Sequence, residues 1–503
     1  MRHWIALIFS LLLALGMGLV WLLMGPGVAP SAAGELAIAD DEFLQADLHY
    51  IGDVHGTDFG NAVAGGGDFN GDGYADIAVG APQYVPSNAL GAVFVFHGRP
   101  GGLKDVPTFS WSALGEQVGS LFGAAVSSAG DVDNNGYDDL LVGAPGFGYG
   151  GSQTQLPDIG RVYLYRGSAF GYADYPVWTV TGDQRDTLLG TSVASAGDVN
   201  GDGYDDVLVG VPWYTGLFAS AGRAYIFYGS ATGLTEALSS TLDGLQVGAG
   251  FGLAVSGAGD LNGDGMDDVI VGAPYQNHPV ITTTLNSGAA FIFYGSGDGV
   301  ETTVGQALYG DQGEANFGKA VSGAGDVNGD GYPEVVVGAP RYNGTAGLST
   351  GAAFLFYGTG SGVETTPRWS ATGPQSYALF GTSISGGSDL SGDGLADVLV
   401  GAPEVSVAGS NSKDGAAYAY LGRASGLAPF WSWRGVPGKA DADYGVSVSM
   451  AGDIDKDGVG DVVVGAPDYF WSEKERRGAV YTYLGASYTP VWRVYVPLVA
   501  RAD

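Results

Sequence analysis

Seven copies of an acidic nonapeptide are the part of this sequence whose residues could most clearly do chemistry. The first copy runs from Asp68 to Asp76 and reads Asp-Phe-Asn-Gly-Asp-Gly-Tyr-Ala-Asp. Side-chain oxygens fall at its positions 1, 3, 5 and 9, and hard cations such as Ca²⁺ take several oxygen ligands in a flexible cage. Position 6 is glycine in every copy, because a chain that wraps oxygens around one point needs a sharp turn with positive φ. The spacing predicts a calcium loop.

The predicted ligands of each loop are the side chains at positions 1, 3, 5 and 9 and the backbone carbonyl at position 7, where the side chain varies. They are Asp68, Asn70, Asp72, Tyr74, Asp76; Asp131, Asp133, Asn135, Tyr137, Asp139; Asp198, Asn200, Asp202, Tyr204, Asp206; Asp260, Asn262, Asp264, Met266, Asp268; Asp326, Asn328, Asp330, Tyr332, Glu334; Asp389, Ser391, Asp393, Leu395, Asp397; and Asp453, Asp455, Asp457, Val459, Asp461. An EF-hand begins similarly, but position 12 is Val79 here instead of a bidentate Glu. We therefore expect up to seven structural Ca²⁺ ions in loops between strands; seven acidic turns without metal are the alternative.

The charge balance supports the same interpretation. The chain has 53 Asp and Glu, 20 Lys and Arg, and a formal net charge of −33. Many of these carboxylates are predicted calcium ligands, and the remaining acidity argues against nucleic acid as a partner, because phosphate binding needs a basic face. The chain has no cysteine, so disulfides do not stabilise it and calcium is expected to do so.

The N-terminal segment indicates export. Residues from Ile5 to Met24 are uncharged and mostly apolar, and twenty such residues can span a bilayer. Ser31-Ala32-Ala33 is a plausible small-residue cleavage site. Residues 1–33 are predicted to be a signal peptide or an N-terminal membrane anchor, followed by a linker over 34–42; a buried soluble helix is the third interpretation.

The nonapeptides lie in a longer repeat of roughly 64 residues. Each repeat has a Phe-Gly pair, a strand of small residues, the acidic loop, an apolar strand ending in Gly-Ala-Pro, a variable loop, and two further strands. The exceptions are Leu189-Gly190 and Gly210-Val211-Pro212 in the third repeat and Tyr444-Gly445 in the seventh. Four strands in each of seven repeats predict an all-β fold, a seven-bladed β-propeller of four-stranded antiparallel blades over residues 43–488. The small residues of the first strand would line the crowded axis.

The sequence offers eight candidates for seven outer strands, because either Leu44–Ile51 or the C-terminal segment Val491–Pro497 could close blade seven. A glycine stands seven residues before the Phe-Gly position in six repeats, and Gly52 is the first of these. This register predicts that Leu44–Ile51 is an outer strand that closes blade seven, since a closed ring leaves no sheet edge exposed. Residues 489–503 are then predicted to be an appended tail.

The order of the Phe-Gly pair, calcium loop and Gly-Ala-Pro resembles the FG-GAP repeat, known from the N-terminal propeller of integrin α subunits. The resemblance covers roughly residues 43–487. It implies calcium at the loop positions above and a role in extracellular or cell-surface adhesion and recognition. Integrin α subunits continue into leg domains and a membrane span, whereas this chain ends soon after blade seven, so we expect a monomeric propeller without a β subunit.

The loops between the second and third strands should lie on the face opposite the calcium loops. The resemblance points to this face, because integrins bind ligands there, and we expect an extracellular protein or glycan to bind through its aromatic residues. The candidates are Tyr84, Tyr149, Trp213, Tyr214, Tyr275, Tyr342, Tyr469 and Trp471. The alternative is that these side chains anchor their loops by packing on neighbouring blades.

An exported hydrolase or lyase acting on polysaccharide and a structural cell-surface component are the alternative functions. The five histidines form no metal-ligand pattern. One Gly-x-Ser-x-Gly occurs at residues 347–351, but a nucleophile elbow needs a strand before it and a helix after it. Most clustered carboxylates are already assigned to calcium, so the sequence favours a recognition module over an enzyme.

Overall fold

The computed structural model describes residues 44–486, apart from 53–55, 85–88, 104–108, 149–157, 174, 236–238, 282–284, 407–411 and 473–474. The predicted signal peptide or anchor (1–33), linker (34–42) and tail (489–503) lie outside these residues and stay predictions. Within the described part of the chain, no helix is long and apolar enough to cross a membrane.

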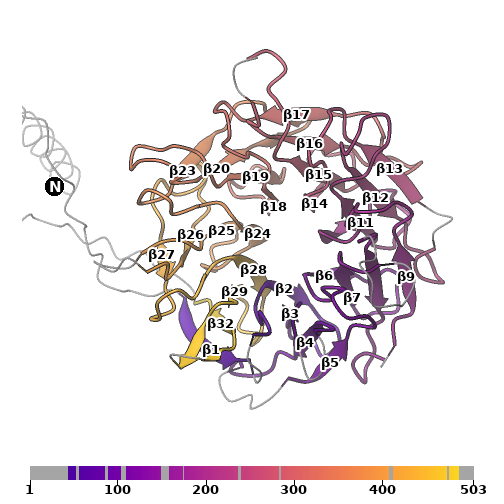
Figure 1. Ribbon diagram of the computed structural model, residues 1–503, viewed down its shortest axis with the longest axis vertical. Helices are drawn as coiled ribbons and strands as arrows, with labels where there is room; N and C mark the ends of the chain where they lie inside the picture. The colour runs from indigo at the N-terminus through magenta and orange to yellow at the C-terminus, as the bar shows by residue number, and fades with distance from the viewer. Residues whose placement is uncertain are drawn as a thin grey trace, which may run out of the picture. The chain divides into compact units, whose positions relative to one another are not determined.

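The described residues form seven four-stranded sheets arranged as the blades of a propeller (Figure 1). The innermost strands are β2 (Ala62–Gly67), β6 (Ala125–Gly130), β10 (Val193–Gly197), β14 (Ala254–Gly259), β18 (Ala320–Gly325), β24 (Ile384–Ser388) and β28 (Ser447–Gly452). The second strands are β3 (Asp76–Ala81), β7 (Asp139–Ala144), β11 (Asp206–Val211), β15 (Asp268–Ala273), β19 (Glu334–Ala339), β25 (Asp397–Ala402) and β29 (Asp461–Ala466). The prediction of a seven-bladed all-β propeller is confirmed.

Two outer strands complete each blade. The third strands are β4 (Ala92–Phe96), β8 (Arg161–Tyr165), β12 (Arg223–Phe227), β16 (Ala289–Phe293), β20 (Ala352–Phe356), β26 (Ala416–Tyr420) and β32 (Ala479–Leu484). The outermost strands are β5 (Trp111–Leu114), β9 (Trp178–Thr181), β13 (Ser239–Asp243), β17 (Gln306–Tyr309), β23 (Trp369–Thr372), β27 (Trp433–Gly435) and β1 (Gln45–Ile51). Short hairpins are formed by β21 (Gly358–Thr359) with β22 (Gly362–Val363) and by β30 (Phe470–Ser472) with β31 (Glu475–Arg476).

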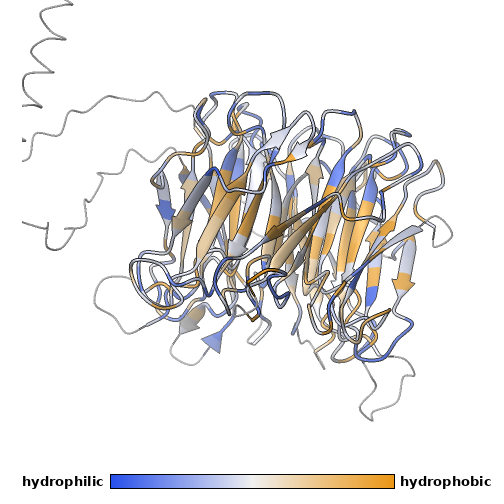
Figure 2. Ribbon diagram, turned by 90° about the horizontal axis from the view of Figure 1, so that it is seen from above, coloured by the Kyte–Doolittle hydropathy of each residue, from blue (hydrophilic) through white to orange (hydrophobic). Residues whose placement is uncertain are grey.

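Burial explains the contrast between the first two strands of a blade. Every residue of the second strands is buried, because each blade packs between two neighbours. Figure 2 shows hydrophobic strand segments in the layer between the two loop faces. The inner strands approach one another at the axis, where side chains have little room. A Cβ added at Gly65 would lie 2.4 Å from Ala451 Cα of blade seven. Small residues are therefore required there.

The Phe-Gly and Gly-Ala-Pro motifs meet within each blade. Gly60 N–H donates to the Gly80 carbonyl at 3.0 Å, while the Phe59 side chain is buried in the core. The same bond joins Gly123 to Gly143, Gly190 to Gly210, Gly252 to Gly272, Gly318 to Gly338, Gly381 to Gly401 and Gly445 to Gly465. A Cβ at Gly80 would lie 2.0 Å from the Gly123 carbonyl oxygen of the next blade. The two motifs therefore hold each blade together and leave room for its neighbour.

The N-terminal strand closes the ring, as its register predicts. Strand β1 pairs antiparallel with β32, so blade seven has the order β1-β32-β29-β28; Figure 1 shows the indigo strand beside the yellow one. Leu44 and Leu48 are buried in the core. Asp47 Oδ2 accepts the Leu103 N–H of blade one at 2.6 Å, and His49 stacks on Tyr481 with ring centroids 4.3 Å apart. One strand thereby joins the last blade to the first.

Removing this strand should therefore open the ring. We expect a chain without residues 35–51 to melt at a lower temperature and to aggregate, because deletion exposes the edge of β32. Leu48→Ala should cost about 2–5 kcal/mol of unfolding free energy, as for other buried leucines. Thermal melts monitored by circular dichroism measure both effects. A chain without residues 489–503 is the control and should melt like the parent; the opposite ranking of the two deletions would contradict this closure.

Candidate calcium loops

The acidic loops follow the inner strands and lead into the second strands, and their backbone wraps around the position 1 carboxylate. In the first loop, Asp68 Oδ1 accepts N–H groups from Gly71 at 2.7 Å and Asp72 at 3.1 Å, and its Oδ2 accepts Gly73 N–H at 2.8 Å. Gly73 has a φ of 83°, the left-handed conformation that glycine adopts without strain. The side chains at positions 3 and 5 also bond within the loop, since Asn70 Oδ1 accepts Asp72 N–H at 2.9 Å and Asp72 Oδ1 accepts Tyr74 N–H at 3.0 Å.

The position 9 carboxylate is the buried part of each loop. Asp76 Oδ1 accepts Gly98 N–H at 2.8 Å from the end of the third strand, and Oδ2 accepts Phe69 N–H at 3.0 Å from position 2. All seven position 9 residues are fully buried: Asp76, Asp139, Asp206, Asp268, Glu334, Asp397 and Asp461. Two backbone bonds fix Asp76 in one orientation, which leaves its remaining lone pairs for another partner.

These carboxyl groups titrate far from their usual range. Burial raises the pKa of Asp76, Glu334 and Asp461 to about 8. It raises the pKa of Asp139, Asp206, Asp268 and Asp397 to about 7. The other carboxylates of each loop raise these pKa values further, while the backbone N–H donors lower them. A carboxylate that is buried among like charges needs either a proton or a cation.

In the fifth and seventh loops, the arrangement of the carboxylate oxygens fits a calcium ion. Asp326, Asp330 and Glu334 each offer an oxygen, and these oxygens all lie within 4.8 Å of one another; Asp453, Asp455 and Asp461 form a second group of this kind. Two oxygens that bind one Ca²⁺ at about 2.4 Å can be at most about 4.8 Å apart. The donors are carboxylates, amides and carbonyls, which suit a hard cation. The ligand assignments made from the sequence remain predictions.

The loops are also joined to one another between blades, which the sequence did not predict. The N–H at position 8 donates to the position 1 carbonyl of the preceding loop, as from Ala75 to Asp453 at 3.0 Å. The same contact is made by Asp138 to Asp68, Asp205 to Asp131, Asp267 to Asp198, Ala396 to Asp326 and Gly460 to Asp389. Pro333 stands at position 8 of the fifth loop and has no N–H to donate. An ion that orders one loop therefore also acts on the junction with its neighbour.

The aromatic candidates of the opposite face divide into two groups. Tyr214 and Tyr469 are only 9% and 5% exposed, and Tyr84 and Tyr342 pack edge-on against the strand residues Phe94 and Phe354; these are the contacts that loop anchoring predicts. Trp213 and Tyr275 stack on each other across two blades, with centroids 5.9 Å apart, and are half-buried. Tyr149 and the side chain of Trp471 lie outside the described part of the chain.

A recurring glutamine holds the variable loops in place. Gln184 Nε2 donates to the Thr215 carbonyl at 3.1 Å, and its Oε1 accepts Thr215 N–H at 3.1 Å. Gln246 and Gln312 grip the next two variable loops in the same two-bond manner. The signal was present in the sequence, because a glutamine stands two residues after the glycine at five blade starts. This repeated glutamine could have been recognised in the sequence as a residue that holds the variable loop.

The raised pKa values predict how the calcium-free protein responds to pH. The folded state holds protons on the position 9 carboxyls up to a pH of about 7 to 8, whereas the unfolded chain releases them near 3.8 for the aspartates and 4.5 for Glu334. Stability is therefore greatest at low pH and falls as pH rises through the folded pKa. In EDTA we expect the melting temperature to fall by several degrees between pH 5.5 and 8.5. Saturating calcium should flatten this dependence; a melting temperature in EDTA that rises over this range would contradict it.

Comparison with known proteins identifies the repeat. The FG-GAP repeat model matches residues 59–96, 122–165, 189–227, 251–293, 317–356, 380–420 and 444–483. Integrin alpha-5 of Xenopus laevis is 35% identical over 234 residues, which are 44% of this chain and 21% of that protein. Integrin alpha-8 of Mus musculus is 34% identical over 235 residues, again 44% of this chain and 21% of that protein. The aligned part thus spans about a fifth of these relatives.

The solved "Structure of Dos1 propeller" aligns with 90% of this chain and 98% of its own, at 12% identity and a TM-score of 0.40. The seven matched segments fall one in each blade, and this chain belongs to the FG-GAP repeat family.

Proposed function

We propose that this protein is an exported, calcium-stabilised propeller that recognises an extracellular protein or glycan through its variable-loop face. The observation that carries the proposal is the pairing of two faces: acidic loops with buried carboxylates on one, and clamped loops with exposed apolar side chains on the other. The similarity to the propeller region of integrin α subunits supports a recognition role. The identity of the partner rests on the surface chemistry below.

Calcium is proposed because the loops are unstable without a cation. Three carboxylates near 4 Å from one another repel by about 4 kcal/mol per pair at an effective dielectric near 20. Position 9 is buried and cannot relieve this repulsion by turning toward water. When bound, calcium supplies the positive charge that lets all the carboxylates stay ionised. The chain's own residues orient the oxygens and tie each loop to the next blade.

The recognition surface is proposed at blades three and four of the variable-loop face. Leu217 is 88% exposed, Leu245 57% and Val247 61%. The Gly248 N–H donates to the Ala219 carbonyl at 3.1 Å, so the connection between these blades lies against the variable loop of blade three. Exposed apolar side chains that are grouped and held by a clamped backbone are typical of binding sites, and a rigid surface loses less entropy on binding.

A non-catalytic role fits the one nucleophile motif better than a hydrolase does. Ser349 lies in a loop with a φ of 46°, its N–H donates to Asn343 Oδ1, and a strand rather than a helix follows at Ala352. This is not the context of a nucleophile elbow. The polysaccharide-active alternative predicts new reducing ends when the protein is mixed with polysaccharides, and our proposal predicts none.

Removing calcium should destabilise the fold sharply. A site whose dissociation constant is about a hundredfold below the calcium concentration adds roughly 2.7 kcal/mol, and several such sites approach the whole net stability of a typical domain. We expect EDTA to lower the melting temperature by more than ten degrees and excess calcium to restore it. Magnesium at the same concentration is the control and should restore little. An unchanged melt in EDTA would refute calcium stabilisation.

Binding can be tested on arrays of extracellular matrix proteins and glycans. We expect the calcium-loaded protein to bind a member of the array, and Trp213→Ala with Leu217→Ala to weaken this binding at least tenfold without lowering the melting temperature. Phe170→Ala is the matched control, because Phe170 is fully exposed on a loop of the calcium face. Equal loss of binding in the control, or loss of stability together with binding in the double variant, would argue against this surface.

A further inference from the structure

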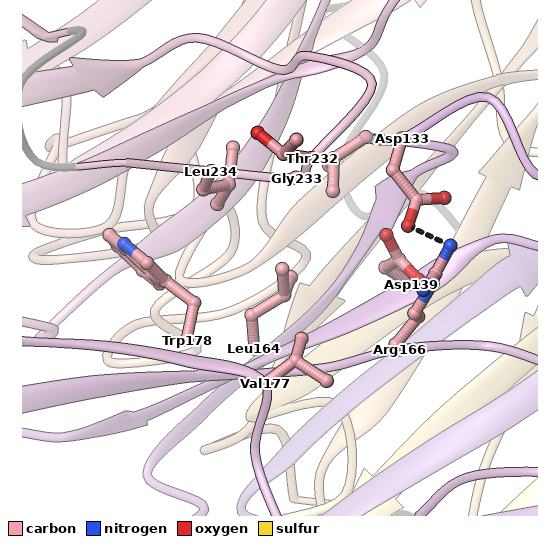
Figure 3. Close-up of a pocket in the computed structure, with 10 residues that line it drawn as sticks. Asp133, Asp139, Leu164, Arg166, Val177, Trp178, Thr232, Gly233 and Leu234 are labelled. Carbon is pink, nitrogen blue, oxygen red and sulfur yellow. Dashed lines mark ion pairs between the residues drawn. The ribbon is translucent and has the colours of Figure 1, made fainter.

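The second acidic loop has a positively charged side chain beside it, that of Arg166. Arg166 follows β8, directly before the glycine whose N–H donates to Asp139 Oδ1 at 2.8 Å. Its Nη2 lies 2.5 Å from Asp133 Oδ2, the position 3 carboxylate. The Asp133 side chain is 6% exposed and that of Arg166 is 50% exposed. Figure 3 shows the ion pair of Arg166 with Asp133 as a dashed line, with Asp139 among the residues that line the same pocket.

No other blade places an arginine at this position. The residues before the corresponding glycine are His97, Tyr228, Tyr294, Tyr357, Leu421 and Leu484. Blade seven provides the closest comparison, because its position 3 is also an aspartate, Asp455, with Leu484 in the place of Arg166. There the oxygens of Asp453, Asp455 and Asp461 lie together as a possible metal site. In blade two the equivalent aspartate is directed to a guanidinium instead.

The position 9 carboxylate is also different in this loop. In the other six loops its second oxygen accepts the position 2 N–H at 2.6 to 3.1 Å, as Asp206 Oδ2 does from Val199. Asp139 Oδ2 is buried without a hydrogen bond of normal geometry. It lines a cavity of about 80 Å³ together with Arg166, Thr232 and Trp178, and the Trp178 indole N–H is likewise buried without a partner. The second loop therefore departs from the other six at positions 3 and 9, both beside Arg166.

We propose that Arg166 is the resident cation of the second loop and that this loop binds calcium much more weakly than the other six. The inference rests on the calcium binding proposed above. A calcium ion in this loop would have to displace the guanidinium from Asp133 and remain within a few ångströms of a positive charge, which lowers affinity by at least about tenfold at the effective dielectric of a partly exposed site.

The Arg166 guanidinium also affects how strongly the junction of blades two and three depends on calcium. The junction of blades two and three is held through this loop, since Asp205 Oδ2 accepts Asp131 N–H at 2.8 Å and the Val132 carbonyl accepts Ser230 N–H at 3.1 Å. A loop that Arg166 already neutralises keeps these contacts when calcium is low. Blades two and three then form the part of the propeller that depends least on calcium.

Native mass spectrometry of the full exported chain at stepped free calcium counts the bound ions. We expect six ions in the parent at a calcium concentration where Arg166→Leu, the residue of blades six and seven, binds seven. Arg166→Tyr, the residue of blades three to five, is a second variant in case the first folds poorly. Arg185→Leu is the matched control, because it removes an exposed arginine from the opposite face and should leave six.

The outcomes separate the two proposals. Seven ions in the parent, filling over the same calcium range as in the Arg166 variants, would overturn the resident cation while leaving calcium binding intact. No bound ions in any variant would overturn both. A gain of one ion in the Arg166 variants alone, accompanied by a lower melting temperature in EDTA than the parent, is the result that the proposal requires.

Discussion

Seven buried carboxylates, one at the start of the second strand of every blade, are the constraint on which the rest of this structure depends. Such a group is expensive to bury unless its charge is balanced. Its two oxygens hold the end of the third strand and the loop's own position 2 in most blades, as Asp76 does with Gly98 and Phe69. The same residue therefore holds two backbone segments together by hydrogen bonds and, when ionised, carries a buried negative charge. The cation proposed above would allow it to do both.

The constraint extends from the loops to the ring through short backbone contacts. The position 8 N–H groups bond each loop to the neighbouring loop, except at Pro333. On the opposite face of the propeller, the glycine of the Phe-Gly pair bonds the start of the inner strand to the end of the second strand. The ring is then closed by β1 on β32. With no cysteine in the chain, closure depends on these non-covalent contacts, so loss of ions and loss of the closing strand should weaken the same assembly.

The regular features of the fold could be predicted from the sequence, because they repeat. The spacing of the nonapeptides, the Phe-Gly pairs and Gly-Ala-Pro predicted seven blades, and the position of Gly52 predicted the closing strand. What could not be predicted depends on which side chains meet when the strands and loops of a blade come together. The Asp133–Arg166 pair joins the acidic loop of blade two to the residue that follows its third strand. The burial of Tyr214 under Arg223, whose guanidinium lies 4.0 Å from the ring centroid, depends on the direction that a loop side chain takes. Aromatic content alone does not distinguish an anchor from a binding residue.

The two faces of the propeller can then serve different purposes. One carries the acidic loops that join neighbouring blades, and the other carries variable loops that glutamine side chains hold in place. The most direct test of this account is a crystal of the protein grown in calcium and measured for anomalous scattering. The account predicts a peak between the position 1 and position 9 carboxylates in the first loop and in the third to seventh loops. Water-filled loops without anomalous signal at these positions would contradict it.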